Sequence, residues 1–307
     1  MPRGFSCHRA VAAVLCTVAL LPAAASGAVF SLSVPATSDI FSAGHDAVPV
    51  TPNGGGTLPP AVVLSGGTGR QIQFTSVTGL VSFNIDAATP DVYRGQYNGP
   101  DGGAVFWQDT KAGNPWPNAY TTDGSQPGLL PPSEKDTATS FYLDMQAYNG
   151  ISGMLLFEPT PADRRVMFLT GVFTTAAGPD GTAPPRLDFS STSTSVPGGR
   201  SFTELSPLVD QLFYVGDGLT GEGVGSLQTF NVPDEATHLY LGLMDGSRFI
   251  HGPDFYGNND GSFAVQGVVV VPEPAAGAMG AIAGVMAACS WLCRRLVAGR
   301  RGLRRQT

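Results

Sequence analysis

Side chains that offer oxygen atoms gather in one short stretch towards the C-terminal end of the chain. They are Asp245, Asp254, Asn258, Asn259 and Asp260. Calcium takes roughly six to eight hard oxygen ligands, and backbone carbonyls complete what carboxylates and amides supply. The stretch therefore indicates a Ca²⁺ site. It is not an EF-hand loop, because Tyr256 stands where that loop requires a ligand.

The same residues also allow a simpler interpretation. Leu239–Met244 indicates a strand, and a second strand is expected from Ser262 onward, with a loop between them. Asn258-Asn259-Asp260-Gly261 between them is typical of a hairpin turn. Composition alone favours this turn over a metal site.

The sequence does not support any of the common catalytic motifs. Gly216–Gly221 fits the spacing of a dinucleotide-binding loop, but Gly223 and Gly225 follow where a helix must begin, so we expect a flexible loop. The chain has no G-x-S-x-G and no H-E-x-x-H motif. We therefore expect no enzymatic activity, with an extracellular hydrolase that uses paired carboxylates as one alternative.

Many short runs with strand-like patterns must position these side chains. Phe141–Ala147 is one example, and Gly, Pro, Asn and Asp separate most of the runs. Such a pattern predicts an all-β, antiparallel β-sandwich over residues 28–270. The other expected strands are Gln71–Phe74, Leu80–Ile85, Ala104–Trp107, Met154–Phe157, Val166–Phe173, Gln211–Val215, Leu227–Val232, His238–Met244 and Ser262–Val271. Long loops are expected at Pro49–Pro60 and Gly178–Arg200.

Charge and cysteine are distributed unevenly along the chain. All 24 acidic residues lie between Asp39 and Glu273, together with nine Lys and Arg, which gives this part a net charge of −15. An acidic surface argues against nucleic acid as a partner and favours cations or neutral ligands. All four cysteines lie in the terminal segments, so we expect no disulfide in the part between them.

The first 27 residues have the pattern of a secretory signal peptide. Arg3 and Arg9 precede the apolar run Ala10–Leu21, Pro22 ends the run, and small residues follow. We expect cleavage before Ala28.

The C-terminal end has three consecutive parts. Pro272-Glu273-Pro274 closes the segment 271–274, residues 275–293 carry no charge, and residues 294–307 contain six arginines and no acidic residue. A helix of 19 residues is about 28 Å long, which is enough to cross a bilayer. Arginines favour the cytoplasmic side, so the part between the two terminal segments is expected outside.

This end resembles the PEP-CTERM sorting signal, which has the same triplet, span and arginine-rich tail in the same order. The resemblance implies that an exosortase-type membrane peptidase recognises Pro272, Glu273 and Pro274. It also implies a precursor that is transiently tethered to the inner membrane by one transmembrane helix. The product would then be released or transferred to the cell surface.

The stretch Tyr256–Phe263 resembles the calcium loop of small galactose-specific bacterial lectins, which are β-sandwiches. The resemblance implies that Asp245, Asn258 and Asn259 give side-chain oxygens to the ion, and that Phe255 and Phe83 give backbone carbonyls. Asp245 and Asn258 would also contact a sugar. The lectins' His-Pro loop for the sugar has no counterpart, and Asn114–Pro117 is only a loose substitute.

Together these features predict a cell-surface or extracellular-matrix protein with a calcium-binding, jelly-roll-like β-sandwich that binds a glycan or matrix polysaccharide. The alternatives are a purely structural envelope component stabilised by calcium, and the extracellular hydrolase named above.

Overall fold

The computed structural model describes residues 26–51, 54–82, 98–102, 143–158, 165–246, 249 and 252–271. These residues belong to one compact unit, Ser26–Pro272. The predicted signal peptide, sorting triplet, membrane span and arginine tail lie outside the described residues, as do the expected strand Ala104–Trp107 and the segment Asn114–Pro117.

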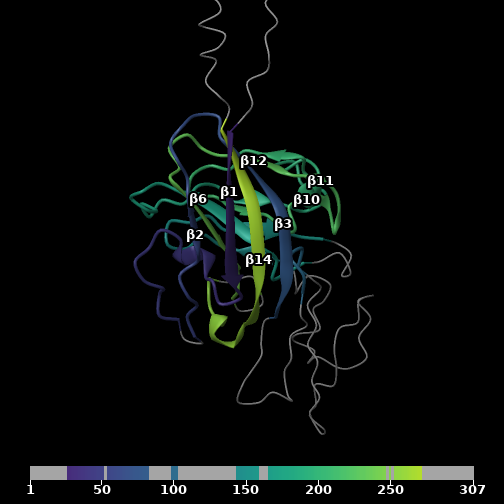
Figure 1. The fold of residues 1–307 in the computed structure, drawn as a ribbon. Helices are drawn as coiled ribbons and strands as arrows, with labels where there is room; N and C mark the ends of the chain where they lie inside the picture. Colours follow the sequence, from purple (N-terminus) through teal and green to yellow (C-terminus); the bar gives the residue numbers. More distant parts are fainter. Residues whose placement is uncertain are drawn as a thin grey trace, which may run out of the picture. The chain divides into compact units, whose positions relative to one another are not determined.

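Two sheets make up most of the unit (Figure 1). The five-stranded sheet has the order β1 (Ser26–Pro35), β14 (Asp260–Val271), β3 (Gln71–Ser82), β12 (Thr229–Asn231) and β8 (Glu204–Leu205). The four-stranded sheet has the order β2 (Ala61–Val63), β13 (His238–Gly242), β6 (Thr170–Thr174) and β9 (Leu212–Tyr214). The prediction of an all-β fold is confirmed, and all but one of the pairings in these two sheets are antiparallel.

The remaining elements are short. A three-stranded sheet joins β4 (Leu143–Met145), β5 (Met154–Leu156) and β7 (Leu187–Asp188), and β10 (Leu219–Gly221) pairs with β11 (Val224–Leu227). Single 3-10 turns are η1 (Ile40–Ser42), η3 (Gly199–Ser201) and η5 (Tyr256–Asn258). The expected loop Gly178–Arg200 therefore contains β7 and the start of η3.

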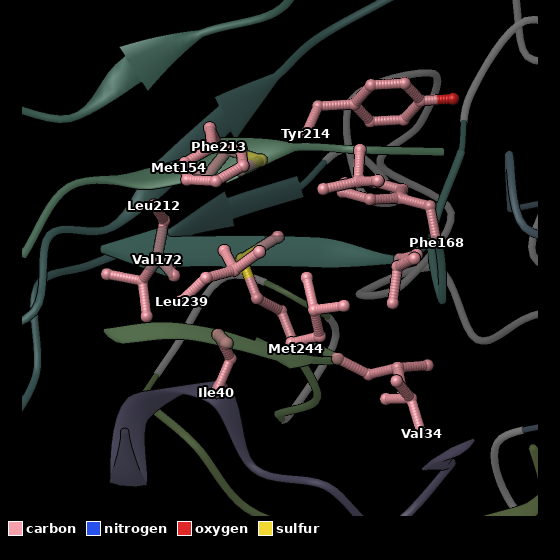
Figure 2. Close-up of a cluster of buried hydrophobic side chains, with 14 of the residues drawn as sticks. Val34, Ile40, Met154, Phe168, Val172, Leu212, Phe213, Tyr214, Leu239 and Met244 are labelled. Atoms are coloured by element: carbon pink, nitrogen blue, oxygen red, sulfur yellow. The ribbon is translucent and has the colours of Figure 1, made fainter. Parts of the chain in front are cut away.

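The two main sheets share one hydrophobic core, which gives the unit its sandwich-like character. Phe213 of β9 and Phe230 of β12 pack together across the two sheets, with their ring centroids 5.2 Å apart. Figure 2 shows Val172, Leu212 and Leu239 of the four-stranded sheet close to Ile40 of η1. Because these side chains are fully buried, the core fixes how the sheets face each other.

Strand β14 is paired along nearly its whole length on both sides. It pairs with β1 from Ser26↔Val271 to Pro35↔Ser262, and with β3 from Asp260↔Ser82 to Val270↔Gln71. Its buried residues include Phe263, Val265 and Val269, the alternation expected of a half-buried strand.

The hairpin interpretation of residues 239–271 is wrong. The consecutive strands β13 and β14 belong to different sheets, so the segment between them crosses from one sheet to the other. A hairpin turn would place the two strands side by side in one sheet. The oxygen-rich stretch therefore lies in a crossing, and its conformation needs another explanation.

The preceding connection, from β12 to β13, is also a crossing between the sheets. Arg70 fixes it from within, since its side chain is 1% exposed and its guanidinium donates to the carbonyls of Ser65, Pro233, Asp234 and Ala236 at 2.8–3.0 Å. A buried polar group thus satisfies the backbone of a loop that leaves one sheet for the other.

Two sequence patterns are explained by local hydrogen bonds and pairing. The glycine motif Gly216–Gly221 is not the expected flexible loop, because its first half is a turn and its second half, Leu219–Gly221, is strand β10. The carboxylate of Asp217 accepts the N–H groups of Leu219 and Gly223 at 2.8 and 2.7 Å and fixes this geometry. The expected strands Gln71–Phe74 and Leu80–Ile85 fall largely within the single strand β3.

Within the part of the chain that the structure describes, no helix combines the length and the apolar character that a membrane span needs. The predicted span, residues 275–293, lies outside that part.

Candidate functional site

The candidate site lies where the crossing from β13 to β14 meets the segment after β1. The crossing is pinched at its base, since Gly246 and Pro253 form an isolated antiparallel bridge and Asp254 donates its N–H to the Asp245 carbonyl at 3.2 Å. On the other side, Asp39 forms a parallel bridge with Leu243. Residues far apart in the sequence therefore meet at one end of the sandwich.

Tyr256 organises the inside of the crossing. Its side chain is fully buried, and its hydroxyl donates to the Leu243 carbonyl at 2.9 Å and accepts the Asp245 N–H at 3.0 Å. Gly56 packs so closely here that a Cβ on it would lie 3.1 Å from the Tyr256 ring and 2.4 Å from the Thr37 carbonyl oxygen. The tyrosine thus holds the backbone of Asp245 in place.

The carboxylate of Asp245 is buried and incompletely satisfied. The residue is 3% exposed, and Oδ1 accepts the Gly246 N–H at 2.7 Å. Oδ2 accepts no hydrogen bond from the residues that the structure describes. Burial raises the pKa of Asp245 to about 7, although the nearby Asn259 side chain and the Gly246 N–H oppose that shift.

The side chain of Asn259 presents a second buried oxygen. Its amide NH₂ donates to the Ala36 carbonyl at 3.1 Å, which anchors the start of β14 to the end of β1. Its Oδ1 is buried and finds no donor among the described residues. Buried acceptors of this kind are rare in native structures and point to a missing partner.

Phe255 and Asn258 complete the local geometry. Phe255 has a left-handed backbone with φ of 68°, and its carbonyl accepts the Asn258 N–H at 3.3 Å at the start of η5. Asn258 is half-buried and therefore more accessible to solvent than the buried Asp245. The tight 3-10 turn places both asparagines directly before β14.

Of the five residues predicted as metal ligands, the structure places Asp245, Phe255, Asn258 and Asn259 in this crossing. Phe83 lies outside the described residues. Its neighbour Ser82 is paired with Asp260, the residue after Asn259.

Asp39 is a further acidic residue of the region that the sequence analysis did not select. It is 1% exposed, and its carboxylate accepts the Phe41 N–H at 3.0 Å and the Ser42 hydroxyl at 2.7 Å, so it caps η1. Burial raises its pKa, and its charge also contributes to the raised pKa of Asp245. An aspartate before an apolar Ile-Phe pair signals a cap, but only the fold brings it near Asp245.

A second polar cluster lies on another part of the unit. The Asp101 carboxylate accepts the Tyr214 hydroxyl at 2.9 Å and the Asp217 N–H at 3.0 Å, and Glu222 forms ion pairs with Arg165 and Arg200. These carboxylates are engaged in tying the β10–β11 hairpin to the core.

No group of three or more His, Cys, Asp or Glu side chains with metal-binding geometry occurs among the described residues. The crossing brings amide and carbonyl oxygens close to the Asp245 carboxylate, with Asp39 and Asp254 near enough to act on its pKa. Comparison of the chain with protein-family models, with curated proteins and with solved structures found no match.

The raised pKa of Asp245 makes the stability of the metal-free protein depend on pH. The Asp245 carboxyl has a pKa of about 7 in the folded protein and near 3.8 in the unfolded chain, so the folded state binds its proton more tightly. The stability gained from that proton is complete below pH 3.8 and is lost as the pH rises through about 7. Asp245→Asn cannot ionise, so relative to wild type it should gain about 4 kcal/mol between pH 4 and pH 8. Urea unfolding with a chelator measures this.

Asp46→Asn, at an exposed position, is the control for the loss of one negative charge, and it should not reproduce the gain expected of Asp245→Asn. Parallel pH profiles of wild type and Asp245→Asn would contradict the assignment.

Proposed function

We propose that this chain is an exported cell-surface or extracellular-matrix protein whose jelly-roll-like β-sandwich holds one Ca²⁺ in the crossing from β13 to β14 and binds carbohydrate there. The observation that carries the proposal is the pair of buried oxygens, Asp245 Oδ2 and Asn259 Oδ1, that accept no hydrogen bond from the described residues. Leaving a buried acceptor unsatisfied costs about 1–3 kcal/mol. A cation between them removes that cost.

The residues present suit calcium. Asp245, Asn258 and Asn259 would give side-chain oxygens, and Phe255 and Phe83 would give carbonyls. The ion supplies positive charge to a site where Asp39 and Asp254 add negative charge around Asp245. It would join the end of β13 to the start of β14, where the chain changes sheet.

Calcium should stabilise the folded protein, because it binds the assembled site and not the unfolded chain. We expect saturating calcium to raise the melting temperature by about 5–10 °C over the chelated protein. Asn259→Ala should reduce this shift to near zero. The measurement is a thermal melt followed by circular dichroism.

Asn231→Ala is the matched control, since Asn231 donates to Glu204 and Ser206 on the surface of β12, and this variant should keep the full calcium shift. A wild-type protein that melts at the same temperature with calcium and with chelator would rule out the site.

The carbohydrate part of the proposal rests on Asn258 and the ion. Calcium with open coordination positions accepts the vicinal hydroxyls of a sugar. Asn258 as a residue is more exposed than Asp245, although its side-chain oxygen is buried. The burial of Asp245 favours the alternative that the ion is purely structural, because it limits access to that carboxylate.

A glycan array separates these two functions. If the site binds sugar, the calcium-loaded protein should bind a defined subset of glycans, with at least tenfold weaker binding for Asn258→Ala and loss of binding in chelator. Asn231→Ala should bind as wild type does. If no glycan on the array binds while calcium still raises the melting temperature, the ion has only the structural function.

We propose a non-catalytic protein. The hydrolase alternative needs two converging carboxylates that a substrate can reach. Asp101, Asp217 and Glu222 are engaged in hydrogen bonds or ion pairs. Asp245 and Asp39 do lie near each other, but they are only 3% and 1% exposed.

The proposal also includes sorting by an exosortase-type peptidase that reads Pro272, Glu273 and Pro274. Strand β14 ends at Val271, so the triplet begins directly after the last residue of the sheet. A peptidase must bind its substrate as extended chain, and a site beyond the ladder meets that requirement. The precursor would be tethered to the inner membrane, and the product would be at the cell surface or secreted.

Mass spectrometry of the protein from the cells that produce it tests the sorting proposal. The mature chain should end near Pro274 and lack the arginines from Arg294 onward, whereas Glu273→Ala should retain them. Glu235→Ala, which removes an acidic residue inside the domain, should be processed normally. A mature wild-type protein that still ends at Thr307 would contradict sorting by cleavage.

A further inference from the structure

Strand β1 is a long open edge of the five-stranded sheet (Figure 1). It has ten residues and pairs without a register shift with β14, its only partner among the described strands. The opposite edge of the sheet, β8, has two residues and includes Glu204. In the other sheet, the edges β2 and β9 have three residues each.

One hydrogen bond just beyond the end of β1 shows which of its residues bond to β14 and which face away from it. Ala36 donates its N–H to the Gly261 carbonyl at 2.9 Å, in the same register as the strand itself. In an antiparallel ladder, every second residue bonds to the partner and those between point the other way. The N–H and C=O groups of Gly27, Val29, Ser31 and Ser33 therefore face away from β14.

Within the described part of the chain, strand β1 has none of the usual protection against pairing. Its sequence Ser-Gly-Ala-Val-Phe-Ser-Leu-Ser-Val-Pro has no charge, and its one proline is the last residue. Gly27, Ala28, Ser31 and Ser33 are exposed, and Val29 is 81% exposed. Natural sheets protect long edges with charges, internal prolines, bulges or covering segments. An unprotected edge of this length is a template for another strand.

We propose that β1 pairs antiparallel with β1 of a second copy of this chain. A two-fold axis beside Phe30 places Val29 opposite Ser31 of the second copy, and Gly27 opposite Ser33 of the second copy. All four outward-facing residues of each strand are then paired, with about eight backbone hydrogen bonds in total. After cleavage before Ala28, the Val29–Ser31 pairs remain.

A second copy fits this edge better than a charged partner does. Residues 39–273 carry a net charge of −15, which makes copies of the chain repel each other at long range. The uncharged β1 is a place where two copies can meet without bringing carboxylates together. Phe30, half-buried against Phe74 at 6.0 Å between ring centroids, would meet its counterpart across the axis.

The oligomeric state of the processed protein recovered from producing cells tests this inference. Light scattering after size exclusion should give twice the monomer mass at about 50 µM, within the range of moderate homodimers. Ser31→Pro removes an outward N–H without touching the bonds to β14, so it should return the mass to that of the monomer.

Val63→Pro is the matched control. Leu64 donates to the Thr237 carbonyl, so the N–H of Val63 also points outward, from the edge of the other sheet, and this variant should remain dimeric. Val29→Lys, which adds charge without changing the backbone, should be monomeric even if Ser31→Pro fails to fold. Circular dichroism establishes folding in each case.

Cysteine cross-linking tests the register. Residues of a hydrogen-bonded antiparallel pair have Cα atoms about 5.5 Å apart, which suits a disulfide. Val29→Cys with Ser31→Cys in one chain should give a covalent dimer, whereas Ala61→Cys with Val63→Cys should not. A monomeric wild type, a dimeric Ser31→Pro, or a β1 double-cysteine variant that stays unlinked would each overturn the inference.

Discussion

The two-sided pairing of β14 is the constraint on which the rest of the structure depends. Its register with β1 is continuous, and its register with β3 is interrupted by one bulge between Gln266 and Gly267. A shift of the whole strand by one residue would turn Phe263, Val265 and Val269 out of the core. The same register fixes both ends of the strand. It begins directly after Asn259 at the candidate site and ends directly before Pro272-Glu273-Pro274, the proposed sorting triplet.

The chain leaves the five-stranded sheet after β12 and returns to it at β14, and each crossing is closed by a buried polar residue. Arg70 satisfies four carbonyls around the first crossing with donors of its own. Tyr256 orders the second, but two acceptors there, on Asp245 and Asn259, are left without donors from the described residues. In the first crossing the unpartnered buried atom is the donor Nε of Arg70, whereas in the second the unpartnered atoms include acceptor oxygens, which is the reason for proposing a cation there.

The acidic character of the part between the terminal segments acts on both inferred interactions. It surrounds Asp245 with further negative charge from Asp39 and Asp254, which favours a cation in the crossing. It also leaves β1 as an uncharged edge on an otherwise acidic protein. The proposed binding of an ion and the proposed pairing of two copies are thus both argued from the same uneven distribution of charge.

Local pattern was sufficient to predict the all-β class, most of the strands and the oxygen-rich stretch, because alternation and turn residues act over a few positions. Local pattern did not predict β1, because Ser26–Pro35 begins inside the segment expected to be a signal peptide. It also did not predict the role of Asp39, because Asp39 lies more than 200 residues before Asp245 in the sequence. It also favoured a hairpin at Asn258–Gly261, because a turn sequence is the same whether the next strand joins the same sheet or another. Only tertiary structure decides that choice. Phe263 and Val265 are buried in the core between the two sheets, and β14 pairs with β1 and β3, not with β13. The turn-like sequence therefore lies in a crossing between sheets, where the candidate site is.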